Sequence, residues 1–418
     1  MRTFAISLLI MLLVSFTLAD APAAASDYTL GIFGNANMDD KIDEDDIEYV
    51  EGIIEGTNGR TELADANYDG EINDGDITQI ELIICGKEKE LKIIDSTDSI
   101  VTVKMPVDKI IPLHMRHAQA VCVLGAEDRI VGVDNTVIES VRLFPKLSKL
   151  PSIGMVRQPD VEQIIVLDPD LVVTFTNSPL PDLFEDKLPE NISVVRFDLS
   201  RAEDMREEMK KLGYILRSGK AADDYLEWYD NNMETVKERI TEIPKENRVK
   251  VFTEREKNNG EEPSVRWAYA TDTGYTDLCD VAGGINIARD HIKYHGDIDS
   301  ECVISQNPDV IIGLSYEGGY EMDDETPFIE YREAIMSLPG FENVDAVKTG
   351  RVYIISGDFS IGPQLAIGTV TVAKWLYPDL FKDLDPQAIH QEYLTRFLRL
   401  DYNLSEHGVF IYPPLEER

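Results

Sequence analysis

The feature that most constrains this chain is a segment that occurs twice. Residues 162–175 read EQIIVLDPDLVVTF and residues 301–314 read ECVISQNPDVIIGL, and matching positions stand 139 residues apart. Each copy predicts a short helix, a Pro-Asp break and a buried strand of branched apolar residues. Such strands with helices between them indicate parallel sheets covered on both faces. Two copies this far apart predict two similar lobes rather than one continuous sheet.

A long helical stretch lies between the two copies. Over residues 201–242, apolar residues recur at helical spacing among charges, and Pro244 ends the pattern. A break centred on Gly219 can divide it. One long helix between two lobes predicts a stiff connection and small movements of the lobes.

The N-terminal 26 residues are typical of a cleaved signal peptide. Arg2 precedes an apolar run over residues 4–18, and small residues follow up to Ser26. That run is shorter than the roughly 20 residues that span a bilayer. We therefore expect an exported protein at the cell surface, outside the cell or in a periplasm-like space. No Cys follows the cleavage region, so a lipid anchor on an N-terminal Cys is not expected.

The net charge and the cysteines limit the expected partners and the thiol chemistry of the protein. The net charge of −38 disfavours nucleic acid as a partner, because an acidic surface repels phosphates. A solvated acidic coat explains that charge without any cationic substrate. In an oxidising exterior Cys279 and Cys302 either pair or remain buried free thiols.

A second, shorter duplication covers residues 34–56 and 64–86, offset by 30 positions. Each copy is an oxygen-rich loop followed by a short amphipathic helix. Calcium takes six to eight oxygen ligands, which loop positions 1, 3, 5, 7, 9 and 12 can supply, position 7 through its backbone carbonyl. The sequence thus predicts two structural Ca²⁺ sites. Their ligands would be Asn35, Asn37, Asp39, Lys41, Asp43 and Asp46 in the first loop, and Asp65, Asn67, Asp69, Glu71, Asn73 and Asp76 in the second.

With a helix on one side only and Asp at position 12, residues 29–87 resemble a dockerin. The resemblance implies a small all-α calcium-loop domain and a cohesin-bearing surface protein as partner. Asp40 replaces Gly at position 6 and Asn35 occupies position 1, so we expect a weaker first site. Ile42 and Ile72, at position 8, are expected to pack the two loops against each other.

From about residue 92 several sequence blocks occur in a familiar order. They are AQAVCVLGAEDRIVG at 118–132, IG at 153–154 with PDVE at 159–162, the repeat, the long helix, LCDVAGGINIA at 278–288 and AVKTGRVYI at 346–354. Over residues 92–415 this order resembles the ferric-siderophore, haem and cobalamin group of ABC-importer solute-binding proteins. The resemblance implies an α/β fold with two Rossmann-like parallel-sheet lobes, at 92–200 and 247–418, joined by the long α-helix at 201–242.

The same resemblance implies a function and partners. Such a protein captures an iron complex (siderophore or haem) or a corrinoid and delivers it to a permease with its ATPase. In that family one glutamate on each lobe meets permease arginines, and the matching positions here are Glu162 and Glu301. A simpler reading is that both glutamates stabilise helix N-termini, worth a few tenths to about 1 kcal/mol each.

Ligands of doubly wound sheets lie beyond the carboxyl ends of the strands. Loops at those ends carry arginines and aromatics, which suit an anionic chelate, and His and Tyr residues, which can ligate a metal. Ferric siderophore, haem, corrinoid and free metal all remain open. The candidate ligand residues are His114, Arg116, His117, Arg157, Arg266, Trp267, Tyr269, Tyr316 and Phe359.

Two other classes compete with transport. A dockerin-like module also accompanies secreted polysaccharide-degrading enzymes and cell-surface scaffold components. The chain shows no nucleophile elbow, no His-Glu-x-x-His and no phosphate loop, and its many carboxylates identify no catalytic pair. We therefore predict that it is not an enzyme.

Overall fold

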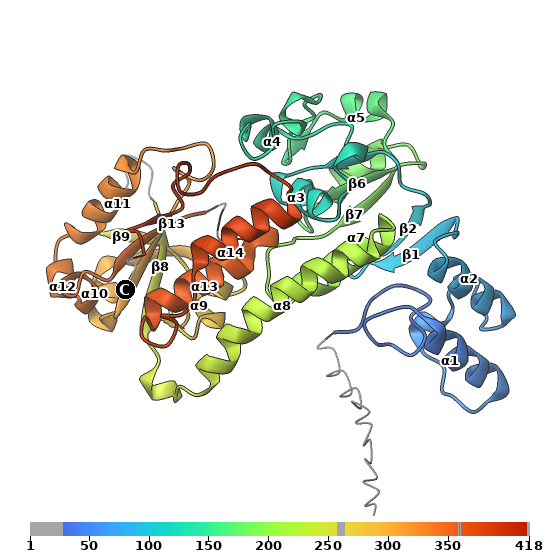
Figure 1. Ribbon diagram of the computed structural model, residues 1–418, viewed down its shortest axis with the longest axis horizontal. Coiled ribbons are helices and arrows are strands. Elements are labelled where there is room, and N and C mark those ends of the chain that lie inside the picture. The colour runs from blue at the N-terminus through green and yellow to red at the C-terminus, as the bar shows by residue number, and fades with distance from the viewer. Residues whose placement is uncertain (1–27, 257–263, 358, 360, 416–418) are drawn as a thin grey trace, which may run out of the picture.

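The computed structural model describes residues 28–256, 264–357, 359 and 361–415, so the expected signal peptide lies outside the described residues. Three units follow one another: an N-terminal module, an N-lobe beginning near residue 90, and a C-lobe beginning near residue 247 (Figure 1). Within these described ranges, no helix combines the length and apolar character needed to cross a membrane.

The N-lobe is built on a small parallel sheet in the order β3-β6-β7, where β3 is Ile110–Pro112, β6 is Leu171–Thr174 and β7 is Ser193–Arg196. Its strands are buried because branched apolar side chains occupy both faces. Around it lie α3 (Met115–Val123), α4 (Asn135–Glu139), α5 (Val161–Leu167), α6 (Pro181–Phe184), and the short hairpin of β4 (Gly154–Met155) and β5 (Gln158–Pro159). A separate antiparallel hairpin, β1 (Glu90–Ile94) with β2 (Ile100–Lys104), opens the lobe.

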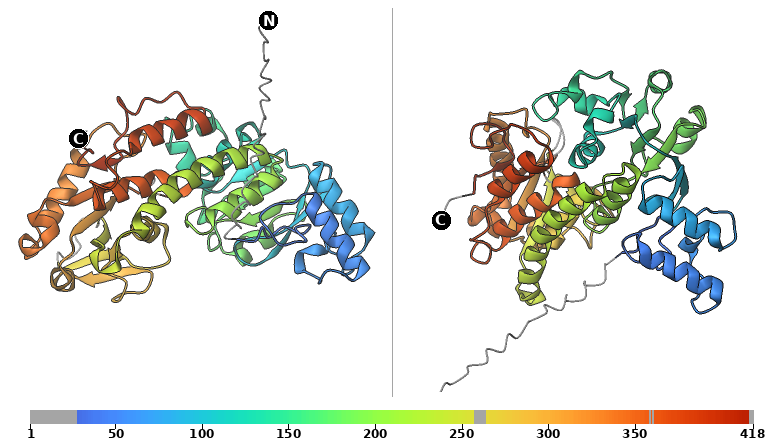
Figure 2. Two further views of the ribbon diagram at one scale, coloured as in Figure 1. Left: turned by 60° about the horizontal axis from the view of Figure 1, so that its bottom comes forward. Right: turned by 45° about the vertical axis from the view of Figure 1, so that its right-hand side comes forward.

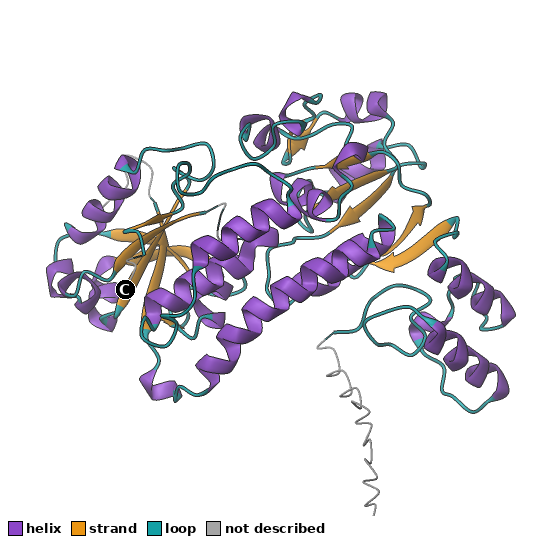
Figure 3. Ribbon diagram, viewed as in Figure 1, coloured by secondary structure: helices purple, strands orange, loops and turns teal. Residues whose placement is uncertain are grey.

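The C-lobe carries a larger mixed sheet in the order β11-β9-β8-β12-β13-β14, with β10 beside β8. Figure 3 shows its strands as the orange group on the left, with purple helices around them. The parallel part is β8 (Lys250–Arg255), β10 (Ile285–Asn286), β12 (Val310–Ser315) and β13 (Val352–Ser356). The antiparallel strands are β9 (Val265–Tyr269), β11 (His295–Asp299) and β14 (Ile411–Tyr412). Its helices are α9 (Gly274–Val281), α10 (Ser300–Gln306), α11 (Thr326–Met336), α12 (Asp345–Lys348) and α13 (Leu365–Leu376). The predicted two-lobed α/β fold with parallel sheets is confirmed, and antiparallel strands are added to it.

The 139-residue repeat forms the same unit in each lobe. α5 and α10 both end at a residue in the left-handed region, Asp168 at φ 49° and Asn307 at φ 46°, before the Pro-Asp pair and the strand. Asp170 and Asp309 each accept backbone N–H bonds of 2.8 Å from the start of the neighbouring strand. The Pro-Asp break therefore ends the helix and sets the register of the strand that follows.

The connection between the lobes differs from the single helix expected over residues 201–242. It consists of α7 (Met205–Ile215) and α8 (Gly219–Thr241), separated by a turn in which Arg217 has φ 51°. α7 packs beside α8 on the N-lobe, and α8 alone, with 23 residues, crosses to the C-lobe (Figure 1). Gly219 is the first residue of α8 rather than the centre of the break.

A second connection returns from the C-lobe to the N-lobe. α14 (Pro386–Glu392) continues into a π-helical turn over Tyr393–Phe397. The Tyr393 ring stacks on Trp228 of α8 with centres 5.6 Å apart, and its hydroxyl donates to Gln119 of α3 at 3.1 Å. Buried apolar side chains from both lobes consequently belong to one continuous core along this double helical spine.

The N-terminal module holds α1 (Glu44–Glu55) and α2 (Asp74–Ile84), which both begin with a capping box. Residues 31–33 extend the β1–β2 hairpin, with Ile94 N–H donating to the Gly31 carbonyl at 2.8 Å. The Ile42 N–H donates to the Tyr214 hydroxyl of α7 at 2.8 Å, so the first loop contacts the N-lobe. Ile42 and Ile72 belong to or pack against the same apolar cluster, and their direct contact stays a prediction. The module is therefore docked on the end of the N-lobe (Figure 2).

All four cysteines are free thiols, Cys279 buried and Cys302 partly buried. Of the two readings for that pair, the structure has the unpaired one.

Candidate ligand cleft and calcium loops

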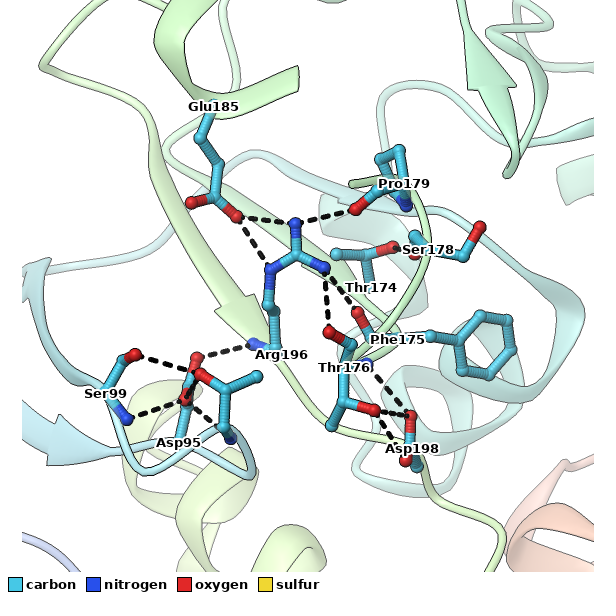
Figure 4. Close-up of polar contacts among 11 residues, drawn as sticks. Asp95, Ser99, Thr174, Phe175, Thr176, Ser178, Pro179, Glu185, Arg196 and Asp198 are labelled. Atoms are coloured by element: carbon cyan, nitrogen blue, oxygen red, sulfur yellow. Dashed lines mark hydrogen bonds and ion pairs between the residues drawn. The ribbon is translucent and has the colours of Figure 1, made fainter. Parts of the chain in front are cut away.

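A buried arginine shapes the loop that follows β6. Arg196 on β7 is 3% exposed. Its guanidinium donates to the carbonyls of Phe175 at 2.7 Å and Pro179 at 2.8 Å, and to Glu185 at 2.8 Å (Figure 4). Thr176, between Phe175 and Pro179, donates its backbone N–H and its hydroxyl to the Asp198 carboxylate. The loop is thus fixed by the interior of the lobe before any ligand arrives.

Phe175, directly after β6, contacts three of the four N-lobe side chains that the sequence singled out as ligand residues. Its ring centre lies 5.0 Å from that of His114 and 4.6 Å from that of His117. The Arg116 guanidinium lies over the same ring at 5.6 Å. His114 caps α3 by accepting the Arg116 N–H, so one short turn presents all three residues.

Both histidines are held in the neutral form. Burial lowers the pKa of His117 to about 4 and, together with the charge of Arg116, keeps the pKa of His114 well below its usual value. His117 Nε2 lies 2.7 Å from the Phe197 carbonyl, and a carbonyl accepts only from a protonated nitrogen. His117 Nδ1 then carries a lone pair, and this buried atom has no hydrogen-bond partner within the described chain.

The C-lobe wall is aromatic with one stacked arginine. The Arg255 guanidinium lies 4.3 Å from the centre of the Trp267 ring, and His295 lies on Trp267 at 5.4 Å. The hydroxyls of Tyr269 and Tyr316 are 3.4 Å apart. Aromatic rings therefore line the end of β8 and the adjoining strands.

Gly357, directly after β13, permits this packing. A Cβ at that position would lie 3.1 Å from the Tyr275 hydroxyl and 3.2 Å from the Tyr316 ring. Tyr275 instead donates to the Gly357 carbonyl.

One arginine from each lobe lies within electrostatic range of Tyr269. Burial raises the pKa of Tyr269, whereas Arg255 of its own lobe and Arg116 of the other lobe lower it, which places both cations near the hydroxyl. The Nε atoms of Arg116 and Arg255 are buried without a hydrogen-bond partner among the described residues. Buried donors left unpaired are costly, so both arginines can donate to a group that the described chain does not itself supply.

Acidic groups are also present on the C-lobe side. Glu256 accepts from the Ser315 hydroxyl at 2.8 Å, and burial and the nearby Glu317 raise its pKa. The positive charge of the cleft thus comes from Arg116 and Arg255 and is not a property of the whole C-lobe wall.

Three expected ligand residues lie elsewhere. Arg266 is buried in the C-lobe and forks onto the fully buried Glu254, with Nε at 2.7 Å. Phe359 is 4% exposed and packs on His390 and Phe410. Arg157 is exposed on the β4–β5 hairpin and lines a different pocket of the N-lobe.

Two residues that build the cleft were missed by the sequence analysis. Phe175 and Arg255 stand at the carboxyl ends of β6 and β8, which is the position that the rule for doubly wound sheets selects. A search of the residues at the carboxyl ends of the predicted parallel strands would have included both.

Glu162 and Glu301 occupy corresponding places on the surface. Each is exposed in the first turn of its short helix, α5 or α10, two residues after the Asp at the N-cap. Carboxylates there suit the helix macrodipole, and their exposure leaves them accessible to a partner.

The two oxygen-rich loops share one hydrogen-bond network. In each, the position-12 carboxylate, Asp46 or Asp76, accepts the N–H of positions 3 and 9 at 2.8–3.2 Å. The position-3 and position-5 side chains accept backbone N–H bonds within the loop in both copies. These bonds turn the oxygens of each loop inward, which is the donor set that calcium requires.

The loops differ at positions 1 and 6. Gly70 at φ 94° donates its N–H to the second oxygen of Asp65 at 2.8 Å. In the first loop Asp40 stays outside the left-handed region, and the Asn35 amide donates to the carbonyls of Leu30 and Asp39. The first loop thus lacks a carboxylate at position 1, although it has Asp43 at position 9, where the second loop has Asn73.

Carboxylates alone do not complete either site. No group of three or more His, Cys, Asp and Glu side chains is arranged to hold a metal ion anywhere in the described ranges. An ion in either loop would need the Asn oxygens and the position-7 carbonyl as well.

Comparison with known proteins agrees with this architecture. Residues 110–358 match the family described as periplasmic binding protein. The chain is 25% identical over 297 residues to an uncharacterised ABC transporter substrate-binding lipoprotein, YvrC of Bacillus subtilis, with 70% of this chain and 87% of that protein covered. It is 27% identical over 341 residues to the molybdate-binding protein MolA of Haemophilus influenzae, covering 74% and 91%.

Among solved structures, the TroA-like periplasmic binding protein FepB of Veillonella parvula superposes with a TM-score of 0.64. The sequence identity is 22%, and the match covers 77% of this chain and 98% of FepB. This likeness shows the fold.

Proposed function

The chain belongs to the periplasmic binding protein family and is the substrate-binding component of an ABC transporter, and we propose that it captures an anionic metal complex between its lobes. The complex would be a ferric siderophore, a haem or a corrinoid. Proteins of this family bind and do not catalyse, so the hydrolase alternative is set aside.

The paired arginines carry the proposal. Arg116 and Arg255 come from different lobes and lie over the rings of Phe175 and Trp267, at 5.6 and 4.3 Å from the ring centres. Each has a buried Nε–H without a hydrogen-bond partner among the described residues. Guanidinium groups bind carboxylate and catecholate oxygens through parallel N–H bonds, while the rings cover flat organic surface. An oxyanion is the second candidate, because the same donors suit a tetrahedral anion and MolA is named for molybdate.

The absorption spectrum of the protein purified from its own source separates these ligands, because haem, corrinoid and ferric catecholate differ in their bands. Titration of the apo protein with each compound and with molybdate, followed by Trp267 fluorescence, gives the affinities. We expect Arg116→Met and Arg255→Met each to weaken binding of the true ligand by about 1.5–3 kcal/mol, the usual value of a charged hydrogen bond. Arg60→Met, an exposed arginine of the N-terminal module, is the matched control. Equal affinity in all three variants would refute the cleft assignment.

For the N-terminal module, the proposal is that each loop holds one structural calcium ion. The support is that two loops 30 residues apart repeat one inward-turned oxygen network, despite their different sequences. When bound, the ion would neutralise the position-12 carboxylates, whose pKa burial raises, in Asp46 to about 6. Isothermal titration of the chelated protein would test this, with two binding events expected and none in an Asp46→Ala, Asp76→Ala double variant.

Attachment and docking complete the proposal. The module would hold the protein to a cohesin or another surface protein, and the exposed Glu162 and Glu301 would engage basic pockets of the permease, which acts with its ATPase. Matched acidic groups on two lobes can report lobe separation to a partner. Charge reversal at either glutamate should abolish stimulation of the transporter ATPase while leaving ligand affinity unchanged.

A further inference from the structure

The two corresponding helices present different surfaces around their glutamates. On α5, Glu162, Ile165 and Val166 share one face at i, i+3 and i+4 spacing, and the two apolar side chains are 40% and 76% exposed. On α10 the equivalent positions are Glu301, Ile304 and Ser305. Ile304 is partly buried against Gly340, where an added Cβ would lie 2.7 Å from its δ-carbon, and Ser305 is polar.

The apolar surface continues from α5 into a pocket. Val161, one turn before Ile165, lines a pocket of about 640 Å³ together with Leu180 and Leu183. These two leucines are 58% and 60% exposed, and Met155 on the neighbouring hairpin is 59% exposed. Several large exposed apolar side chains of the chain thus gather on this end of the N-lobe, although single exposed ones need no explanation.

The charge of the pocket departs from that of the chain. Its only charged lining residues are Arg157 and Lys187, in a protein of net charge −38. Asp182 and Asp186 lie close in sequence but do not line it. One wall, residues 177–179, belongs to the loop that Arg196 fixes from below, so the pocket has a defined shape.

We propose that the two lobes dock unequally on the transporter. The N-lobe would bind through this apolar surface, defined by Val161, Ile165, Val166, Leu180 and Leu183 and extended by the basic pocket, whereas the C-lobe would contribute charge through Glu301. The occupant is a segment of the membrane subunit that carries an apolar side chain beside a carboxylate. This rests on the proposed function, because a substrate-binding component has to dock on its transporter.

The repeat supplies a matched pair of variants for the test. Val166→Asp and Ser305→Asp place the same charge four residues after the glutamate of each lobe, on exposed positions that leave the core intact. Their affinity for the membrane subunits and ATPase, reconstituted in lipid nanodiscs, is measured by biolayer interferometry, with ATPase stimulation as a second readout. We expect Val166→Asp to weaken docking about ten- to thirty-fold, as loss of an apolar anchor does, and Ser305→Asp less than about three-fold.

Further measurements distinguish a loss of docking from a loss of ligand binding or of folding. Leu183→Ser, which adds no charge, should also weaken docking, while ligand titration and melting temperature stay as in the unchanged protein. Equal effects of Val166→Asp and Ser305→Asp, or no effect of Leu183→Ser, would overturn the unequal docking. So would a dimer of the free protein that Val166→Asp dissolves, because a second copy would then cover the surface. Failure of the unchanged protein to bind the nanodiscs at all would instead remove the proposed function.

Discussion

Replacing Arg196 by methionine should loosen the N-lobe wall of the cleft. Methionine keeps the unbranched apolar stem but removes the guanidinium that holds the carbonyls of Phe175 and Pro179 at 2.7 and 2.8 Å. Glu185 loses its partner as well. The loop over residues 175–179 then keeps the bonds of Thr174 and Asp198 and the ring contacts of Phe175 with His114 and His117.

The expected loss of stability in Arg196→Met depends on which buried groups lose their partner. Breaking a buried ion pair costs about 3–5 kcal/mol when the remaining charge stays buried. Here the Arg196 side chain is 4% exposed but that of Glu185 is 36% exposed, so the carboxylate can turn to water. The two carbonyls contribute about 1–3 kcal/mol each if they remain buried. We therefore expect a loss of about 3 kcal/mol, near the lower end for a buried pair.

Urea unfolding and amide hydrogen exchange measure the two consequences separately. Exchange should accelerate over residues 174–180, and affinity for a ferric catecholate, read from Trp267 fluorescence, should fall because Phe175 no longer supports Arg116. Arg351→Met is the control, since Arg351 also holds two carbonyls, of Trp375 and Leu376 at 2.9 Å, but in the C-lobe away from this loop. It should lower stability without changing exchange of the loop. Unchanged exchange and affinity in Arg196→Met would refute the reasoning.

Three further outcomes follow from the structure. Chelation of calcium should lower the free energy of unfolding of the whole chain by about 2.7 kcal/mol for each site that was held at 100-fold above its dissociation constant, because residues 31–33 and Ile42 join the module to the hairpin and α7. The melting temperature in calorimetry should fall accordingly, and a separate, small transition of the module alone would contradict this. Asn35→Asp with Asp40→Gly should tighten the weaker calcium site about tenfold in a calorimetric titration, since it restores the position-1 carboxylate and the left-handed glycine of the second loop; no change would mean that position 1 does not contact the ion. Burial lowers the pKa of His390 to about 3, so as the pH falls below 6.5 this histidine takes up a proton in the unfolded chain but not in the folded chain. The stability lost between pH 6.5 and pH 4, measured by urea unfolding, should therefore be about 3 kcal/mol smaller in His390→Gln, and parallel pH profiles of the two proteins would contradict this.

The two-lobed architecture was predictable because the repeat is a complete local unit. A helix, a Pro-Asp break and a branched apolar strand each have strong local signals, and two copies report two sheets. The two oxygen-rich loops were equally clear as a pattern, because their polar residues recur at the same spacing in both copies, whereas calcium binding stays a prediction. The internal difference between them, at Asn35 and Asp40, was also visible before the structure, whereas the docking of the first loop on Tyr214 was not.

The ligand residues were predicted less well, and the error at Arg266 has a simple cause. Adjacent residues of a strand point to opposite faces, so Arg266 and Trp267 could not both face the cleft. Phe359 was misplaced for a different reason: its partners His390 and Phe410 come from a C-terminal segment whose return to the core has no local signal.

The same return of the C-terminal segment leads us to expect little movement of the lobes when ligand binds. α8 and the α14 extension cross between them together, and Arg142 of the N-lobe forks onto Asp323 of the C-lobe at 2.7 and 3.0 Å. Opening the lobes would require breaking this fork and parting a continuous core, which costs far more than one ligand contact supplies. Nitroxide labels at Asp182 and Asp290, in a Cys85→Ser, Cys302→Ser background, should shift by less than about 2 Å on ligand addition. In Arg142→Ala the distribution of the same label-to-label distance should broaden. A ligand-induced shift of many ångströms in the protein with Arg142 intact would instead show that the double spine bends and that the lobes close as a hinged clamp.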